Sequence, residues 1–226
     1  TLPNYIDVTT FLRVNPELGL FFFDGRFRPV PLAQTFIGVK NNKFPQCEAD
    51  MDDTCYDKIV DFARKGKQIM VFVHARNATV KTAMALLEKA RNKGQTGLFE
   101  PDGEEITGSQ VGQARKLMSK SRNNQLIELF QAGFGIHHAG MLRSDRNLVE
   151  SLFGKGHIKV LCCTATLAWG VNLPAHAVII KGTEIYKNGK FEDVGILDVL
   201  QIFGRAGRPQ FDTSGNGTII TKHDKL

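Results

Sequence analysis

The sequence predicts an α/β fold in which a mostly parallel sheet carries helices on both faces, together with a protruding β-hairpin. Short apolar runs of strand length alternate along the chain with longer segments in which apolar residues recur at helical spacing. This alternation is typical of a parallel sheet that is covered on both faces. The chain has 226 residues, of which 42% are hydrophobic, so it can bury the core of one large domain or two small ones.

The first half of the chain is expected to alternate strands and helices. Apolar runs bounded by Gly, Pro and Asp predict the strands, and helical spacing ending at a glycine predicts the helices. The predicted elements are strands at 20–23, 32–39 and 68–73, a loop at 41–50, and helices at 51–65 and from a cap at Asn77 to Gly94. The three phenylalanines at 21–23 are interpreted as core residues and not as a platform for stacking bases.

The second half continues the same alternation. The predicted elements are a surface loop at 95–108, a helix at 109–130, strands at 134–138, 158–164 and 177–182, and a helix at 145–153. The basic residues of the helix at 109–130 are interpreted as a solvated face; they are Arg115, Lys116, Lys120 and Arg122. Asn188-Gly189 between two alternating runs predicts a hairpin at 183–193.

Charge and cysteine usage limit the class of protein. The net charge of +6 at pH 7 favours a polyanionic partner, such as a nucleic acid or a nucleotide. The four cysteines include no Cys-x-x-Cys pair, so they signal neither a zinc site nor a disulfide framework. No apolar run approaches the ~20 residues of a membrane-spanning helix, so we expect no membrane partner. The chain starts without a Met or a signal peptide and is expected to be part of a longer protein.

An arginine-rich stretch at 201–212 is the strongest functional signal. If it forms a short helix that ends near Pro209, then Gln201, Arg205 and Arg208 share one face. Two guanidinium groups on one edge repel each other unless an anion lies between them, and a phosphate chain suits their planar donor groups. The alternative is a surface pair bonded to carboxylates. The two intervening glycines would allow another backbone to approach closely.

This stretch, Gln-x-x-Gly-Arg-Ala-Gly-Arg-Pro, resembles motif VI of the superfamily 2 helicases, in the form used by the Ski-like DExH-box branch. The resemblance implies a RecA-like domain in which Arg205 and Arg208, with Gln201 beside them, reach ATP bound by a neighbouring domain. It extends over 1–226, with 1–5 resembling the tail of motif III. The motif wording is most similar to the first cassette of the large two-cassette helicases.

Two further segments follow predicted strands and resemble nucleic-acid contacts of the same family. Residues 71–77 resemble motif IV, which implies contacts to the strand backbone from His74, Ala75 and Arg76. Residues 136–140 resemble a His-His-Ala-Gly element near the nucleic-acid path, which implicates His138 and Gly140. A metal site at the two adjacent histidines is excluded, because neighbouring strand residues point to opposite faces.

Residues 164–174 resemble motif V of the same family. Small hydroxyl side chains at a strand end suit phosphate oxygens and do not read sequence. By resemblance, Thr164 and Thr166 contact the nucleic-acid backbone, and Gly170 and Asn172 face the nucleotide. Trp169 is interpreted as a core residue and not as a base-stacking one.

The predicted hairpin at 183–193 has an aromatic tip with basic neighbours. Tyr186 and Phe191 flank the turn, and Lys187 and Lys190 lie beside them. A wedge at a duplex fork needs this combination, because it replaces lost base stacking while it meets phosphates. In the Ski-like branch a hairpin at this place separates the strands. A plain surface hairpin is the alternative.

The sequence contains no Gly-x-x-x-x-Gly-Lys-Ser/Thr stretch, so it has no P-loop of its own. It contains no Asp-Glu-x-His stretch either. ATP and magnesium are therefore expected to be held mainly by an absent first RecA-like domain, and this domain alone is expected to be inactive. The resemblance implies 3′–5′ translocation on DNA or RNA, membership of a multiprotein complex, and a location in nucleus and cytoplasm, in processes such as DNA repair, ribosome quality control or splicing. The alternatives are a non-catalytic helicase cassette that docks partners and a simple single-strand-binding module.

Overall fold

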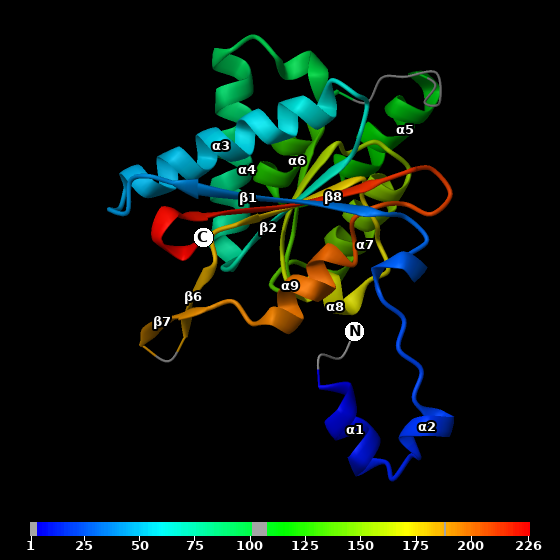
Figure 1. Ribbon diagram of the computed structural model, residues 1–226. Coiled ribbons are helices and arrows are strands. Elements are labelled where there is room, and N and C mark those ends of the chain that lie inside the picture. Colours follow the sequence, from blue (N-terminus) through cyan, green and yellow to red (C-terminus); the bar gives the residue numbers. More distant parts are fainter. Residues whose placement is uncertain (1–3, 101–107, 188) are drawn as a thin grey trace.

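The computed structural model describes residues 4–100, 108–187 and 189–226. Its core is a six-stranded sheet in the order β1-β8-β5-β2-β4-β3, and every pairing between neighbouring strands is parallel (Figure 1). The strands are β1 (Leu32–Val39), β2 (Ile69–Val73), β3 (Phe134–His137), β4 (Val160–Thr164), β5 (Ala177–Lys181) and β8 (Gly215–Lys222). The predicted α/β class with a mostly parallel sheet is therefore confirmed.

Helices cover both faces of this sheet (Figure 1). The helices α3 (Gln46–Ala63) and α4 (Arg76–Asn92) lie on one face, and α7 (Arg143–Gly154), α8 (Thr166–Gly170) and α9 (Ile196–Phe203) lie on the other. Right-handed crossovers explain this division. The chain crosses the sheet in one direction from β1 through β2 to β3, and it then returns through β4 and β5 to β8. Connections that run in opposite directions place their helices on opposite faces. The central strands β2 and β5 are buried along their whole length, which explains why their sequences are apolar except for Lys181, the last residue of β5, which pairs with Asp52.

The first part of the chain forms an arm that extends away from the sheet (Figure 1). It contains α1 (Tyr5–Phe11), α2 (Pro16–Gly19) and a short 3₁₀ turn at Gly25–Phe27. The predicted strand at 20–23 is wrong, and so is the interpretation of its phenylalanines as core. Phe21, Phe22 and Phe23 are each at least 65% exposed. Phe22 contacts the ring of Tyr5, and Phe23 contacts that of Phe27, both within the arm. The tail of motif III predicted at 1–5 lies mostly outside the described residues.

Three predicted helix boundaries are also wrong. The helix expected at 51–65 begins at Gln46, so the expected loop at 41–50 is shorter. Asn77 is not a cap: α4 begins one residue earlier, after Ala75 in an extended conformation, and no side chain caps it. The segment 109–130 forms two helices, α5 (Gly108–Met118) and α6 (Asn124–Gln131), because the side chain of Asn123 accepts a hydrogen bond from the Leu126 amide and starts a new helix.

The predicted hairpin is confirmed as the antiparallel pair β6 (Glu184–Lys187) and β7 (Lys190–Asp193). Its turn residue Asn188 lies outside the described residues. Ion pairs from the short 3₁₀ turn at the chain end and from β8 hold the hairpin at its base. Lys222 Nζ lies 2.5 Å from Glu184 Oε2, and Lys225 Nζ lies 2.8 Å from Asp193 Oδ1.

The chain contains further short 3₁₀ turns at Thr96–Leu98 and His223–Lys225. The first lies within the predicted surface loop at 95–108, of which 101–107 are outside the described residues. Among the residues that the structure describes, no helix has the length and apolar character needed to cross a membrane.

Candidate functional site

Residues from the ends of β2 and β3 meet at the carboxyl edge of the sheet. Arg76 begins α4 and is exposed, and its side chain lies over Gly140: a Cβ placed on that glycine would be 3.1 Å from Arg76 Cδ. The Gly140 amide donates to His138 Nδ1 at 3.1 Å. Burial lowers the pKa of His138, and the Arg76 charge lowers it further, so this ring is neutral beside a permanent cation. The structure thus brings three of the predicted nucleic-acid residues together.

His74 and His137 are engaged within the fold. His74 Nε2 contacts the carbonyl oxygen of Gly182 at 2.7 Å, so its ring is directed toward the hairpin base while Ala75 is exposed. His137 is buried, and its Nε2 contacts Glu150 Oε1 at 2.7 Å, on the other side from His138. The two adjacent histidines therefore do not converge, and among the described residues no group of three His, Cys, Asp or Glu side chains could hold a metal ion.

The end of β4 supplies the two threonines of the predicted motif V. Thr164 Oγ1 and Thr166 Oγ1 are 2.8 Å apart and share a hydrogen bond at the start of α8. The interpretation of Trp169 as a core residue is wrong, because it is 55% exposed and its Nε1 donates to Asp198 Oδ1 at 3.0 Å. A tryptophan needs a partner for its N–H, and here it finds one on α9 at the surface.

Motif VI does not form the predicted helix to Pro209. The helix α9 ends at Phe203, and Ala206 instead pairs with Ala175: the Ala175 amide donates to Arg205 O at 2.9 Å, and the Gly207 amide donates to Ala175 O at 2.7 Å. Arg205 therefore lies in the turn that follows the helix, where its amide donates to Ile202 O at 2.9 Å, and Arg208 lies beyond the pairing with Ala175. They do not share a helical face with the half-buried Gln201.

Gly207 explains why this segment needs glycine. Its φ is +86°, and a Cβ would meet Val30 Cγ1 at 2.6 Å and the Cα of Gly215 at 3.3 Å. The prediction that a missing Cβ allows close approach of another backbone is correct at this position. Gly170 is different, because a Cβ there would meet nothing within 4 Å.

Arg205 connects motif VI with motif V. Its Nη1 donates to Asn172 Oδ1 at 3.3 Å, and its Nη2 donates to the Ala168 carbonyl. The side chain is half-buried, and burial lowers the pKa of its guanidinium. An arginine remains protonated at neutral pH, and the two oxygen atoms that accept from Arg205 are neutral, so these contacts do not compensate its charge.

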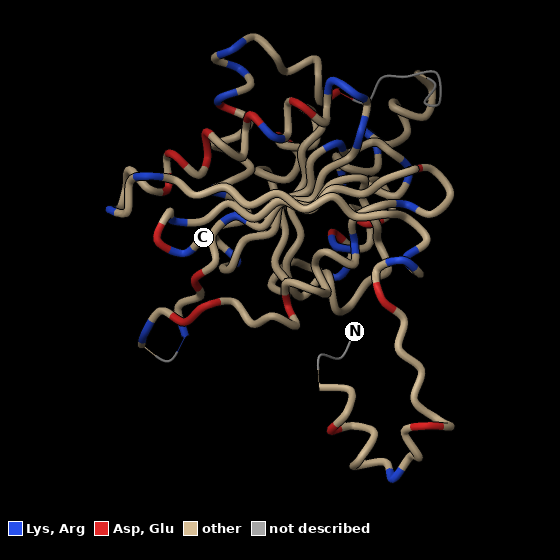
Figure 2. Tube along the Cα trace, in the orientation of Figure 1, with Lys and Arg blue, Asp and Glu red and all other residues tan. Residues whose placement is uncertain are grey.

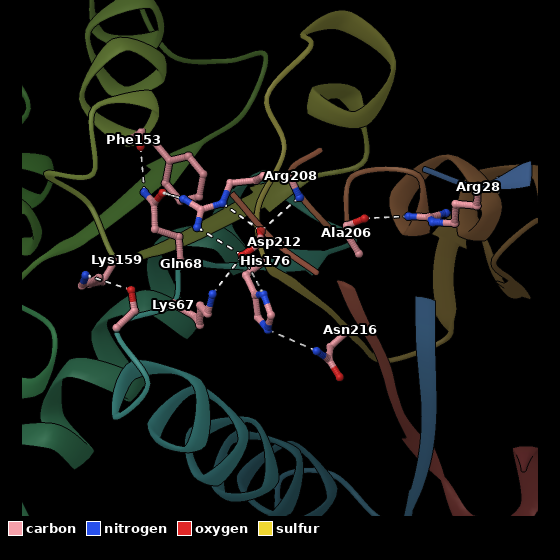
Figure 3. A network of polar contacts seen from close by, with 11 residues as sticks. Arg28, Lys67, Gln68, Phe153, Lys159, His176, Ala206, Arg208, Asp212 and Asn216 are labelled. Atoms are coloured by element: carbon pink, nitrogen blue, oxygen red, sulfur yellow. Dashed lines mark hydrogen bonds and ion pairs between the residues drawn. The ribbon is translucent and has the colours of Figure 1, made fainter. Parts of the chain in front are cut away.

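Arg208 is bonded to a carboxylate. Its Nε donates to Asp212 Oδ2 at 2.9 Å, and its Nη1 donates to Gln68 Oε1 at 3.1 Å (Figure 3). The side chain keeps 22% of its surface exposed. Gln68 and His176 directly precede β2 and β5, so this contact lies at the amino edge of the sheet.

Two residues that hold motif VI in place were not predicted from the sequence. Asp212 is the buried carboxylate that receives Arg208, and its only sequence signal was its position four residues after that arginine. Arg28, in the segment that leads from the arm to β1, donates through Nη2 to Ala206 O at 2.6 Å (Figure 3). The same Nη2 donates to Phe203 O at 3.1 Å. A cation at these carbonyls stabilises the end of α9.

The tip of the hairpin presents two aromatic rings to solvent. Tyr186 and Phe191 are opposite each other in the strand register, their ring centroids are 5.2 Å apart, and they are 67% and 69% exposed. Lys187 and Lys190 lie beside them, so the strand ends at the tip are blue in Figure 2 and the base is red. The structure thus matches the predicted aromatic and basic tip.

Comparison with known proteins identifies the class. Residues 53–210 match the family described as the helicase conserved C-terminal domain. The match covers more than half of the chain, so the chain belongs to this helicase family, and its parallel sheet is the RecA-like fold expected of it.

Relatives match over the whole length of this chain. The chain is 65% identical over 229 residues to activating signal cointegrator 1 complex subunit 3 of Homo sapiens and 66% identical over 228 residues to the protein of the same name from Bos taurus. It is 56% identical over 228 residues to DExH-box ATP-dependent RNA helicase DExH14 of Arabidopsis thaliana.

Each comparison covers 100% of this chain and 10% of the relative, so the chain spans about a tenth of the length of these curated relatives. The motif wording resembles the helicase of the activating signal cointegrator complex and, more distantly, the large spliceosomal helicase. The relatives confirm the first resemblance and the membership of the DExH-box group.

Proposed function

We propose that this chain is the second RecA-like domain of an ATP-dependent 3′–5′ helicase that acts on DNA or RNA, in the first cassette of a large two-cassette protein. A first RecA-like domain of the same protein would hold ATP and magnesium, because this chain has no P-loop. The isolated domain is then inactive. The relatives' names favour membership of a multiprotein complex, and we propose activity in nucleus and cytoplasm.

The observation that carries this proposal is the contact between Arg205 and Asn172. It joins motif VI to motif V through a cation whose partners are an amide oxygen and a carbonyl oxygen. The charge of Arg205 is therefore available to an anion beside Gly170, which is the arrangement that a triphosphate requires. Arg208 completes the pair, and Gln201 lies on the last turn of the preceding helix.

ATP closes the cleft between the two domains in this mechanism. Arg205 and Arg208 gain contacts with the γ-phosphate only in the closed state, and a ligand drives closure only through such differential contacts. An arginine finger raises the rate of related phosphoryl transfers by a factor of about 10³–10⁵. Hydrolysis removes these contacts and allows the domains to separate.

The carboxyl edge of the sheet grips the nucleic acid during this cycle. Ala75, Arg76, His138 and Gly140 lie at the ends of β2 and β3, and Thr164 and Thr166 lie at the end of β4. His74 contributes from its main chain, since its ring contacts Gly182. These groups suit phosphate and sugar atoms, so binding is expected to be salt-dependent and largely independent of sequence. The hairpin tip then separates the strands.

The decisive experiment measures ATP hydrolysis by the full-length protein, with any second cassette inactivated at its own P-loop lysine. Arg205→Ala and Arg208→Ala are each expected to lower kcat at least about a hundredfold, while the affinity for single strands stays within threefold. Unchanged turnover in both variants would exclude the arginine-finger assignment. If the unmodified cassette binds nucleic acid but never hydrolyses ATP, it is the alternative, a non-catalytic cassette that docks partners.

A further inference from the structure

The side chain of Asp212 is completely buried, with 0% of its surface exposed, and both of its carboxylate oxygens accept hydrogen bonds from the Arg208 side chain. Arg208 Nε lies 2.9 Å from Oδ2 and Nη2 lies 3.3 Å from Oδ1, and the Arg208 main-chain amide donates to Oδ2 at 3.0 Å. A carboxylate that accepts two parallel N–H groups fixes the plane of a guanidinium as well as its position. The backbone contact fixes the start of the same side chain.

The orientation of Asp212 is itself fixed by two residues from elsewhere in the chain (Figure 3). Lys67 Nζ and His176 Nδ1 each contact Asp212 Oδ1 at 3.1 Å. Asn216 Nδ2 lies 3.2 Å from His176 Nε2, and an amide NH₂ can only donate. Nε2 of His176 is therefore the acceptor, and Nδ1 carries the proton that Asp212 accepts.

Asp212 is ionised in this network. Burial alone would raise the pKa of its carboxyl, but the hydrogen bonds from Arg208 and Lys67 outweigh burial and hold the pKa well below the ordinary value. Burial lowers the pKa of His176, so that ring is neutral at pH 7. Two cations therefore face one anion, and the cluster keeps a net positive charge. An ordinary ion pair would cancel the charge of Arg208, whereas this one does not.

Gln68 holds the other edge of Arg208. Its Oε1 accepts from Nη1 at 3.1 Å, while its Nε2 donates to the carbonyls of Phe153 and Ile158 at 2.7 and 2.8 Å, which fixes the orientation of the amide. These contacts occupy three of the five N–H groups of the guanidinium, and no contact with a described residue uses the other two. The Phe211 ring covers the guanidinium, with Arg208 Cζ 5.2 Å from its centroid.

We propose that Asp212, itself held by Lys67 and His176, is a positioning residue that orients Arg208 toward the phosphate chain of ATP. This inference rests on the arginine-finger role proposed for Arg208. The additional point is that a buried carboxylate orients the arginine before ATP binds. The two remaining N–H groups of the guanidinium are then already directed as the phosphate contact requires. A flexible arginine would lose side-chain freedom on each turnover, whereas an oriented one has lost it already.

The test compares Arg208→Ala, Asp212→Asn and the double variant in the full-length protein with any second cassette inactivated. Asp212→Asn keeps the shape of the side chain and removes its charge. It is expected to lower kcat of ATP hydrolysis tenfold to a hundredfold, with KM for ATP and single-strand affinity changed less than threefold. The double variant should be no more than twofold slower than Arg208→Ala, because Asp212 acts through Arg208.

Two controls separate orientation from folding. Asp52→Asn removes another buried carboxylate, which pairs with Lys181, and should lower the melting temperature while kcat stays within twofold. Asp212→Glu restores the charge and should recover part of kcat. If Arg208→Ala lowers kcat and Asp212→Asn does not, or if the two losses multiply in the double variant, the positioning role is wrong while the finger stands. If Arg208→Ala leaves kcat unchanged, the finger itself is wrong, and the positioning role falls with it.

Discussion

His74 Nε2 lies 2.7 Å from the carbonyl oxygen of Gly182 and thereby connects the end of β2 to the residue that joins β5 to the hairpin. Gly182 has a φ of +82°, so the chain turns sharply at this point. Burial lowers the pKa of His74, which keeps the ring neutral. The contact therefore couples the carboxyl edge of the sheet to the base of the hairpin without placing a charge between them.

Replacing His74 should affect unwinding more than binding. A hydrogen bond of this kind contributes a net ~1 kcal/mol, so His74→Ala should lower the duplex unwinding rate about fivefold. ATP hydrolysis and single-strand affinity should stay within twofold. A parallel loss of affinity and unwinding would mean that the ring contacts the strand directly. Strand-displacement and binding measurements on the same preparation distinguish the two results.

The aromatic hairpin tip provides the second prediction. Replacing Tyr186 and Phe191 together by alanine should lower unwinding at least about tenfold, because base–aromatic stacking is worth ~1–3 kcal/mol per base. ATP hydrolysis should remain unchanged, since the tip extends away from motifs V and VI (Figure 1). Full-rate unwinding by this double variant would rule out the wedge.

Tyr186→Phe is the matched control for the tip. It keeps the ring and its contact with Phe191, and removes only the hydroxyl. Unwinding should stay within twofold if stacking is what matters. A loss as large as that of the double alanine variant would assign the effect to the hydroxyl and would contradict the stacking argument.

The elements that were predicted correctly are those whose apolar composition is a direct consequence of burial. The strands β2, β4 and β5 are apolar up to their last residues, Thr164 in β4 and Lys181 in β5, because parallel strands in the middle of a sheet are buried on both faces. By contrast, β8 was not predicted. It begins Gly215-Asn216-Gly217, which is typical of a turn, and its strand conformation depends on pairing with β1 and β5. Gly217 lacks a Cβ because one would meet the Phe203 ring at 2.9 Å.

The site was predicted at the level of motifs but not of partners. The contact of Arg205 with Asn172 spans 33 residues and joins two recognised motifs, although no local pattern specifies it. The partners of Arg208 lie up to 140 residues away in sequence, and only the fold brings them together. The helix predicted through Arg208 failed because pairing of Ala206 with Ala175 outweighs local helix propensity.

Arg76 provides the third prediction, on the salt dependence of binding. It is exposed at the start of α4 and lies over Gly140. If it neutralises one phosphate, Arg76→Ala should reduce the slope of log affinity against log salt concentration by about one. Lys89→Ala is the control, because Lys89 is a cation near the opposite end of α4 and is paired with Asp53 at 2.7 Å. An equal change in both variants would mean that the effect is one of overall charge.

The last prediction concerns acid sensitivity. The pKa of each of five histidines lies below its ordinary value with burial as the first cause; they are His74, His137, His138, His157 and His176. Below about pH 6.5, the unfolded chain therefore binds more protons than the folded one, so stability is greatest above that pH and falls as the solution is acidified toward the folded-state pKa values. The lowered pKa of Asp212 does not contribute here, because its stabilisation is lost only below about pH 3.9.

The melting temperature should therefore fall between pH 7.5 and 5.5. His157→Phe should flatten that fall, because His157 is buried and its Nδ1 has no hydrogen-bond partner among the described residues. A melting temperature that is constant or rises on acidification would contradict the burial of these rings.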